Sequence, residues 1–246
     1  MPVQDFGRVA DIYDATRALP EEQMRALLKA IETQVGSHGS LVDVGVGTGR
    51  FAKPLQDLGL QVAGVDVSKG MLAKAREKGA VGLILADAHR LPFQDKKFDA
   101  SLMVHILHLV ADWSKVVREA ARVSRRAVLS VTGSTVGPSL EEDYLGIRTQ
   151  LGYPLKRFEA GESGVQERVE PMKVIRVGDV EREFDSDEEI DSLLRREESL
   201  TWDLPEEVHQ RVIAELRASH SGKVFRTKGA IELVVWSPEQ LRLLHR

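Results

Sequence analysis

The sequence predicts an α/β protein built on a doubly wound, mostly parallel sheet. Short apolar runs alternate with segments of helical spacing from residue 41 to residue 132. A glycine-rich turn separates the first apolar run from the helix that follows it. With 246 residues, 42% of them hydrophobic, the chain can bury a substantial core. Alternating strands and helices imply right-handed crossovers and a sheet covered on both faces.

The predicted elements begin with an amphipathic helix over residues 19–35, which has Pro20 near its first turn and Gly36 after its end. Strand and helix then alternate, and Ser68 is placed to cap the third of these helices. The expected strands are 41–45, 61–66, 81–86, 98–104 and 127–132, and the expected later helices are 50–58, 68–78 and 113–123.

The alternation stops after Thr132, and the next strong strand, Ala230 to Trp236, follows a stretch far longer than an ordinary connection. We therefore expect residues 133–229 to form an α+β lid inserted after the fifth strand. Its expected parts are a strand pair over 172–184 that turns at Gly178-Asp179 and helices over 186–199 and 205–220. The predicted domains are a core of 1–132, the lid of 133–229, and a final core strand with the C-terminal tail over 230–246.

Composition narrows the function classes. The absence of cysteine excludes disulfides, thiolate metal sites and a cysteine nucleophile. A net charge of −4 gives no broad basic field for nucleic acid. No stretch is long and apolar enough to span a bilayer, and the N-terminus lacks the layout of a secretory signal. We expect a cytoplasmic protein that binds neither nucleic acid nor membrane; its oligomeric state is left open.

The sharpest motif is Asp43-Val-Gly-Val-Gly-Thr-Gly49, which lies between a strand and a helix. Its glycines allow a ligand to approach the backbone, and the helix start favours an anion such as a carboxylate. The third glycine falls one position too early for the dinucleotide motif G-x-G-x-x-G, and Lys53 is wrongly spaced for a nucleotide-phosphate loop. A merely tight strand-to-helix turn is the alternative interpretation.

The segment Leu41 to Leu55 (LVDVGVGTGRFAKPL) resembles the first motif of the class I S-adenosylmethionine-dependent methyltransferases. Three later segments resemble the family in its own order: QVAGVDVSKGM over 61–71, ADAHRLPF over 86–93 and FDASLMVHILHLV over 98–110. The resemblance covers about residues 10–132. It implies a seven-stranded Rossmann-like sheet, S-adenosylmethionine as the cofactor and S-adenosylhomocysteine as the product.

The resemblance also implies roles for particular residues. The glycines of the turn should accommodate the amino-acid end of the cofactor, Asp43 should orient the turn or its ligand, and Asp66 should hold the ribose hydroxyls. A helix-capping acid is the alternative for Asp66. Four residues should contact the adenine, with core packing as the alternative for Met71 and a loop carboxylate without a ligand role as the alternative for Asp87. The residues concerned are Gly45, Gly47 and Gly49 for the turn, and Val67, Met71, Asp87 and Ala88 for adenine.

Tyr13 and Arg17 resemble residues that close over the cofactor in many relatives, and a plain surface arginine is the alternative. Val104 and His105, just past the fourth strand, are expected beside the cofactor. His105 and His108 lack a third ligand nearby, so no metal is expected. His105 as a base toward substrate stays an open alternative, and no catalytic residue is named.

These observations predict in-line methyl transfer to a small molecule, because the sulfonium already activates the methyl group and the protein has mainly to align the acceptor. A non-catalytic S-adenosylmethionine or S-adenosylhomocysteine sensor is the alternative, and the glycine spacing disfavours a nicotinamide oxidoreductase. The segment 199–209 resembles the lid helix entry of some small-molecule relatives. Acceptor choice should reside in the lid, with Tyr144, Tyr153, Phe158, Trp202 and His209 as candidates that could equally be lid core or surface.

Overall fold

The structure is a computed structural model that describes residues 10, 14, 19–110, 112–155 and 161–244. The chain divides into two compact units. Unit 1 comprises residues 1–133, 158–178 and 231–246, and unit 2 comprises residues 134–157 and 179–230. Each unit is described by itself below.

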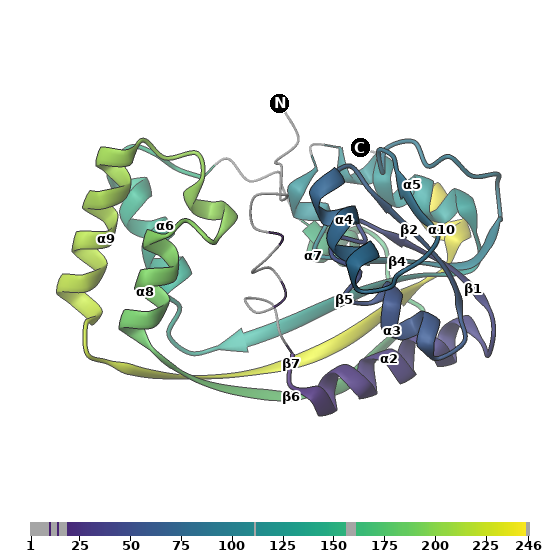
Figure 1. Ribbon diagram of the computed structural model, residues 1–246, viewed down its shortest axis with the longest axis horizontal. Coiled ribbons are helices and arrows are strands. Elements are labelled where there is room, and N and C mark those ends of the chain that lie inside the picture. Colours follow the sequence, from purple (N-terminus) through teal and green to yellow (C-terminus); the bar gives the residue numbers. More distant parts are fainter. Residues whose placement is uncertain (1–9, 11–13, 15–18, 111, 156–160, 245–246) are drawn as a thin grey trace. The chain divides into compact units, whose positions relative to one another are not determined.

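A sheet of the predicted kind forms unit 1 (Figure 1), and its strand order is β3-β2-β1-β4-β5-β7-β6. The pairings of β1 with β2 and β4, of β2 with β3 and of β4 with β5 are all parallel. The carboxyl ends of these strands therefore meet at one edge of the sheet. The strands are β1 (Ser40–Val44), β2 (Gln61–Asp66), β3 (Leu83–Leu85), β4 (Phe98–Val104), β5 (Ser124–Val136), β6 (Lys173–Asp185) and β7 (Val224–Trp236).

Apolar residues at helical spacing fix the helices that flank this sheet. In α2 (Glu21–Val35) the residues Leu27, Leu28, Ile31 and Val35 are buried, and Gly36 at its end has φ +95°. The side chain of Ser68 accepts from the Met71 amide at the start of α4 (Lys69–Glu77), as predicted for its N-cap. The other helices of unit 1 are α3 (Ala52–Asp57), η2 (Leu107–Leu109), α5 (Trp113–Val123), α7 (Gly161–Arg168) and α10 (Pro238–Arg242).

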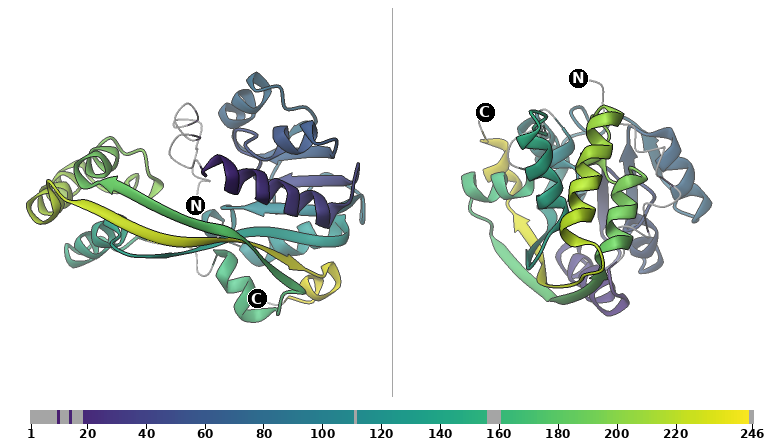
Figure 2. Two further views of the ribbon diagram at one scale, coloured as in Figure 1. Left: turned by 90° about the horizontal axis from the view of Figure 1, so that it is seen from below. Right: turned by 90° about the vertical axis from the view of Figure 1, so that its left-hand side faces the viewer.

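Unit 2 has a core of its own, formed by α6 (Leu140–Gln150), α8 (Ser186–Leu194), η3 (Ser199–Thr201) and α9 (Glu206–His220). Helices α6, α8 and α9 lie side by side (Figure 2) and pack on one another. Leu193, Val212, Ile213 and Leu216 are among the buried residues between them. Unit 2 therefore contains a packed helical cluster and is more than a long loop.

The strand pair predicted over 172–184 is wrong. Residues 173–185 form one continuous strand, β6, which pairs with β7. Gly178 is absent from the residues of positive φ, so the backbone at Gly178-Asp179 stays extended and makes no turn. Pairing along a neighbouring strand outweighs the local turn preference of the Gly-Asp dipeptide.

Residues 158–178, predicted as part of the lid, cluster with unit 1 in the structure. The reason is the apolar side of α7, where Val165 is fully buried in the core cluster of unit 1 with Val169 packed against it. Strands β5 and β7 are also longer than the predicted 127–132 and 230–236.

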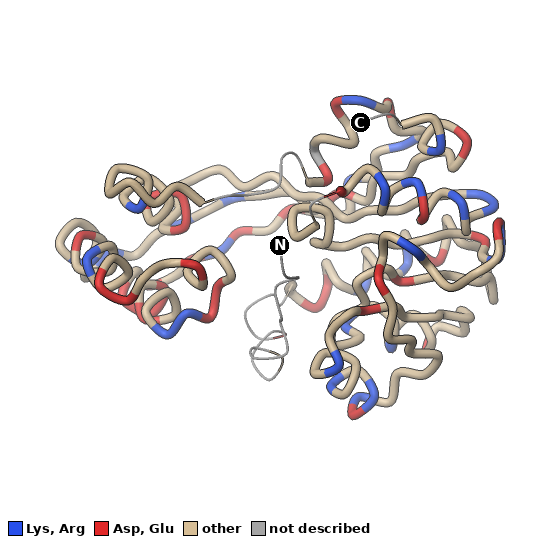
Figure 3. Tube along the Cα trace, turned by 90° about the horizontal axis from the view of Figure 1, so that it is seen from above, with Lys and Arg blue, Asp and Glu red and all other residues tan. Residues whose placement is uncertain are grey.

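Acidic and basic residues are interspersed along the tube of each unit (Figure 3), in keeping with a net charge of −4. Across the described ranges, no helix is both long enough and apolar enough to cross a membrane.

Candidate functional site

A pocket opens in unit 1 where β1, β2 and β4 end. Its space is about 810 Å³, counted with the opening to solvent. Ligands of doubly wound folds bind at this edge of the sheet. Residues at or just after the ends of four successive strands, β1 to β4, line it: Gly45, Gly47, Val65, Asp66, Val67, Ser68, Met71, Ala86, Asp87, Ala88, His89, Val104, His105, Ile106, Leu109 and Val110.

The glycine turn after β1 is tied to the neighbouring strand, because the amides of Gly45 and Val46 both donate to the Val65 carbonyl, at 2.8 and 3.0 Å. Gly45, Gly47 and Gly49 all have positive φ, which side chains disfavour. Their surroundings differ. A Cβ at Gly45 would lie 2.7 Å from Ile106 and one at Gly49 3.1 Å from Ala75, whereas a Cβ at Gly47 would meet nothing closer than 4.0 Å.

The space beside Gly47 therefore belongs to the pocket. Gly45 also borders the pocket, while packing on Ile106 explains its own lack of a side chain. Gly49 is absent from the lining and packs on Ala75 of α4. Gly47 is thus open to a ligand. Gly45 and Gly49 instead leave room for the close approach of Ile106 and Ala75.

Asp66, the last residue of β2, faces this turn. Its Oδ2 accepts from the Gly47 amide at 2.9 Å and its Oδ1 from the Ser68 amide at 2.8 Å. A carboxylate oxygen has further acceptor capacity beyond one hydrogen bond, so Asp66 can brace both loops and still accept from ligand hydroxyls. Asp66 can therefore bind the loop that precedes α4 and still be available for the predicted contact with the ribose hydroxyls.

Asp43 lies beneath the turn and is 3% exposed. Burial, and to a lesser extent the negative charge of Asp66, raise the pKa of Asp43 to about 7. The residue is not part of the pocket lining. Its predicted function of orienting the turn fits this position better than direct contact with a ligand.

Asp87 and His89 also line the pocket. Oδ1 of Asp87 accepts from the His89 amide at 2.9 Å and lies 2.6 Å from His89 Nδ1. Burial acts to raise the pKa of Asp87, but these hydrogen bonds and the nearby positive charge lower it overall. Asp87 is therefore ionised at neutral pH. Ala88, 7% exposed, follows it in the wall.

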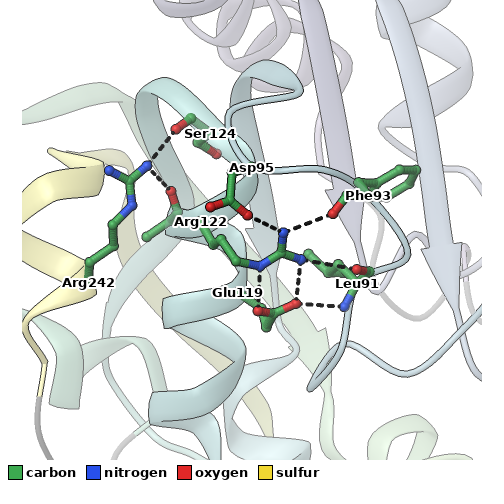
Figure 4. Close-up of polar contacts among 8 residues, drawn as sticks. Leu91, Phe93, Asp95, Glu119, Arg122, Ser124 and Arg242 are labelled. Atoms are coloured by element: carbon green, nitrogen blue, oxygen red, sulfur yellow. Dashed lines mark hydrogen bonds and ion pairs between the residues drawn. The ribbon is translucent and has the colours of Figure 1, made fainter.

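The loop that carries Asp87 and Ala88 is held from α5 (Figure 4). Arg122 donates to the carbonyls of Phe93 and Leu91 at 2.8 and 3.1 Å. Glu119 accepts from the Leu91 amide at 2.8 Å and from Arg122 Nε at 2.7 Å. Burial would raise the pKa of Glu119, but its bonds with Arg122 lower it, so both groups stay charged. One ion pair thus fixes the backbone of the loop at both Leu91 and Phe93.

His105 and Ile106 form the wall that follows β4. His105 has φ +54°, which is uncommon for a residue other than glycine. The rings of His105 and His108 are 6.5 Å apart in an edge-to-face arrangement. No group of three or more potential ligands placed to hold a metal occurs among the residues with described positions.

The structure brings most predicted site residues together. Val67 and Met71 from the α4 side and Val104 from β4 line the same pocket as Asp66 and Asp87. Tyr13 and Arg17 lie outside the described residues, and so does Phe158. Sequence reasoning missed Leu109 and Val110 as wall residues. Their nearness to the fourth strand end was the available signal.

Two lid candidates, Tyr144 and His209, are buried in the core of unit 2, where Tyr144 Oη lies 2.7 Å from His209 Nδ1. They are core residues of unit 2, which agrees with the alternative interpretation that they are not pocket residues. Trp202 donates through Nε1 to the Arg196 carbonyl at 2.8 Å, whereas Tyr153 is 42% exposed.

Comparison with known proteins agrees with this geometry. Residues 42–129 match the family described as "Methyltransferase domain". Among curated proteins, the chain is 32% identical over 145 residues to malonyl-[acyl-carrier protein] O-methyltransferase of Buchnera aphidicola, covering 58% of each chain. It is 34% identical over 126 residues to demethylmenaquinone methyltransferase of Paenarthrobacter aurescens, covering 49% of each. The chain thus spans about half the length of the curated relatives that it matches.

Among solved structures, the YcgJ protein of Bacillus subtilis aligns with a TM-score of 0.58 at 21% identity, over 88% of this chain and 99% of that one. This similarity shows a shared fold. The family match runs from within β1 to within β5, and it includes all the residues that line the pocket described above. Residues 42–129 thus match a methyltransferase domain, and the chain shares the fold of a solved structure.

Proposed function

We propose that this chain transfers the methyl group of S-adenosylmethionine, in line, to a small-molecule acceptor. The observation that carries the proposal is the pocket at the carboxyl ends of β1, β2 and β4, which is lined by Asp66 and by Gly47, a residue with open space where a side chain would lie. The described residues that line the pocket all lie within residues 42–129, the part of the chain that matches the methyltransferase domain.

The residues present fit this cofactor. The backbone at Gly47 leaves room that a Cβ would fill, so the amino-acid end of the cofactor can approach the turn closely. Asp66 is placed to accept from the two ribose hydroxyls, and the ionised Asp87 to accept from the exocyclic amine of adenine. Val67 and Met71 supply apolar surface for the ring.

When bound, S-adenosylmethionine supplies an electrophilic methyl group on its sulfonium. The protein has to hold the acceptor at the correct distance and angle and to keep the pocket wall rigid. A general base is required only where the acceptor must lose a proton. His105, exposed at the pocket wall, is the described histidine best placed to take that role for such an acceptor.

The acceptor itself is proposed at the level of a small molecule. The two curated relatives are named for different acceptors, malonyl-[acyl-carrier protein] and demethylmenaquinone, and the similarity to each covers about half of this chain. Unit 2, which lies outside the matched residues, is the region expected to discriminate between acceptors.

The direct test is a turnover assay. The chain is incubated with S-adenosylmethionine and a panel of small amines, carboxylic acids, phenols and thiols, and S-adenosylhomocysteine is measured. We expect formation of S-adenosylhomocysteine that depends on one chemical class of acceptor. Saturable cofactor binding with no turnover on any acceptor would contradict the enzymatic function and favour a sensor.

Gly47→Val provides the inactive control. The valine side chain would occupy the open space at residue 47 and would strain a backbone whose φ is +53°. Gly152→Val is the matched variant, since Gly152 has φ +87° and nothing within 4 Å of a Cβ but lies far from the pocket in sequence and in unit 2. We expect Gly47→Val alone to abolish cofactor binding.

A further inference from the structure

The two carboxylate oxygens of Asp87 differ in their contacts. Oδ1 accepts from the His89 amide at 2.9 Å and lies 2.6 Å from Nδ1 of the His89 ring. A carboxylate oxygen has two lone pairs, so these two contacts fill Oδ1. Oδ2 makes no hydrogen bond with any residue whose position the structure describes. Because Asp87 lines the pocket, Oδ2 is the oxygen that is left for a ligand.

The ring of His89 is the donor in this pair. Burial acts to raise the pKa of Asp87, but the bonds from His89 lower it overall, so the carboxylate is ionised at neutral pH and can only accept. Nδ1 of His89 must therefore carry a proton. His89 thus directs both its backbone amide and its side chain to the same oxygen of Asp87.

The backbone on both sides of Asp87 is held without the His89 ring. The Ala86 amide donates to the Asp66 carbonyl at 3.0 Å, and the Arg90 amide donates to the Asp87 carbonyl at 3.0 Å. Between them, Ala88 is 7% exposed and belongs to the core cluster of unit 1. The freedom that remains at Asp87 is rotation of its side chain, and the bond from the His89 ring restricts that rotation.

Stability is a poor explanation for the pair. The side chain of Asp87 is 61% exposed and that of His89 is 22% exposed. Pairs this open to water contribute little to folding, because solvent screens their attraction. Both residues line the cofactor pocket, so a fixed carboxylate acts mainly on what the pocket binds.

We propose that His89 is a positioning residue for recognition of the base: its ring holds Oδ1 of Asp87, which leaves Oδ2 fixed to accept from the exocyclic amine of adenine. A carboxylate that is already fixed loses less conformational entropy when the ligand binds. The proposal rests on the proposed function, because adenine has to lie beside Asp87.

Three variants isolate the ring. His89→Ala removes the ring and keeps the backbone amide that donates to Asp87. His89→Asn returns a side-chain donor two bonds from Cβ, as Nδ1 is. Arg90→Ala is the matched control, since Arg90 is an exposed residue of the same loop and is not among the residues that line the pocket.

Two ligands are compared by calorimetry with each variant. One is S-adenosylhomocysteine, and the other is its 6-deamino analogue, in which hydrogen replaces the exocyclic amine of adenine. The analogue lacks the donor that Oδ2 of Asp87 would accept from, so the ratio of the two affinities reports this one contact. A general loss of structure would instead weaken both ligands together. Thermal unfolding measures the stability of each variant.

We expect the wild type to bind S-adenosylhomocysteine at least about tenfold more tightly than the analogue, as for a hydrogen bond to a charged group. His89→Ala should weaken S-adenosylhomocysteine roughly three- to tenfold, the effect of immobilising one side chain, and leave the analogue nearly unchanged. His89→Asn should restore part of the preference, and Arg90→Ala should keep all of it.

A preference in His89→Ala equal to that of the wild type, or an equal weakening of both ligands, would overturn the role of His89 alone. Loss of folding in His89→Ala would also contradict it, because an exposed pair contributes little to stability. A wild type that binds the two ligands equally would overturn the contact of Asp87 with adenine. A wild type that binds neither ligand would overturn the proposed function itself.

Discussion

At the scale of single residues, the glycine turn and the acid at the end of β2 were both predicted from sequence, because each follows an apolar strand directly. The distinction between the glycines was not. It depends on Ile106 and Ala75, which approach the turn from elsewhere in the chain, with Ile106 close to Gly45 and Ala75 close to Gly49. Contacts of this kind have no local sequence signal.

Asp66→Asn tests the carboxylate at the end of β2. The amide keeps one acceptor oxygen but loses the charge and the second acceptor. We expect the dissociation constant for S-adenosylmethionine to rise roughly 10- to 100-fold, since hydrogen bonds to charged groups contribute about 1.5–3 kcal/mol. Calorimetry measures it. Asp57→Asn, on an aspartate whose side chain is 62% exposed, is the control. Equal affinities for Asp66→Asn and the wild type would contradict the ribose role.

Asp43 gives a pH dependence with a defined sign. Its pKa is about 7 in the folded chain and 3.8 in the reference state. Between these values the folded chain binds more protons than the unfolded one, so the contribution of Asp43 to stability is present below about pH 4 and is lost as the pH rises to 7.

Asp43→Asn removes this loss. Without cofactor, we expect the variant to be more stable than the wild type at pH 8, by up to roughly 4 kcal/mol, and to differ less at pH 5. Urea unfolding at both pH values measures the difference. A variant that is less stable than the wild type at pH 8 would show that the buried carboxylate is compensated by interactions with its surroundings.

At the scale of elements, the alternating strands and helices of the core were predicted well because each buries one apolar face or run. Strand β6 was predicted wrongly as two strands, because Gly178-Asp179 has the composition of a turn. The local sequence does not show that a long neighbouring strand, β7, pairs with this segment and keeps it extended. The support of the 87–95 loop by α5 was also missed. Arg122 and Glu119 are ordinary charges of a helix surface until the loop is placed beside them.

Arg122→Met tests this support. The change removes the bonds to Leu91 and Phe93 and leaves Glu119 without its cation. We expect a loss of stability on the order of 2 kcal/mol, faster hydrogen exchange over residues 87–95 and weaker cofactor binding. Exchange mass spectrometry and urea unfolding measure these effects.

Arg125→Met is the matched control. Arg125 follows α5 and pairs with Asp99 at 3.0 Å, but its side chain is 47% exposed. The expected loss is below about 1 kcal/mol, with no change in the 87–95 loop. Equal effects of the two variants would show that the Arg122 bonds do not hold the loop.

At the scale of the whole molecule, the chain has two cores, and strands β5, β6 and β7 each contribute residues to both units. The sequence predicted a region with structure of its own after residue 132. It did not show that residues 158–178 would return to unit 1, because the apolar residues of α7 are few and their partners lie elsewhere in the chain.

Two separate cores predict separable effects. Tyr144→Phe removes the hydroxyl that lies 2.7 Å from His209 Nδ1 in the core of unit 2. We expect a loss of stability of about 1–2 kcal/mol with an unchanged dissociation constant for S-adenosylmethionine. Thermal unfolding and calorimetry measure the two quantities. A parallel loss of cofactor affinity would indicate that the core of unit 2 is coupled to the pocket.

The central claim is that the pocket between the glycine turn and Asp66 holds the cofactor. A crystal structure of the chain grown with S-adenosylhomocysteine tests it most directly. The account predicts the ligand in this pocket, with its ribose hydroxyls on Asp66 and its amino-acid end beside Gly47. A ligand bound elsewhere, or a pocket left empty at saturating concentration, would contradict it.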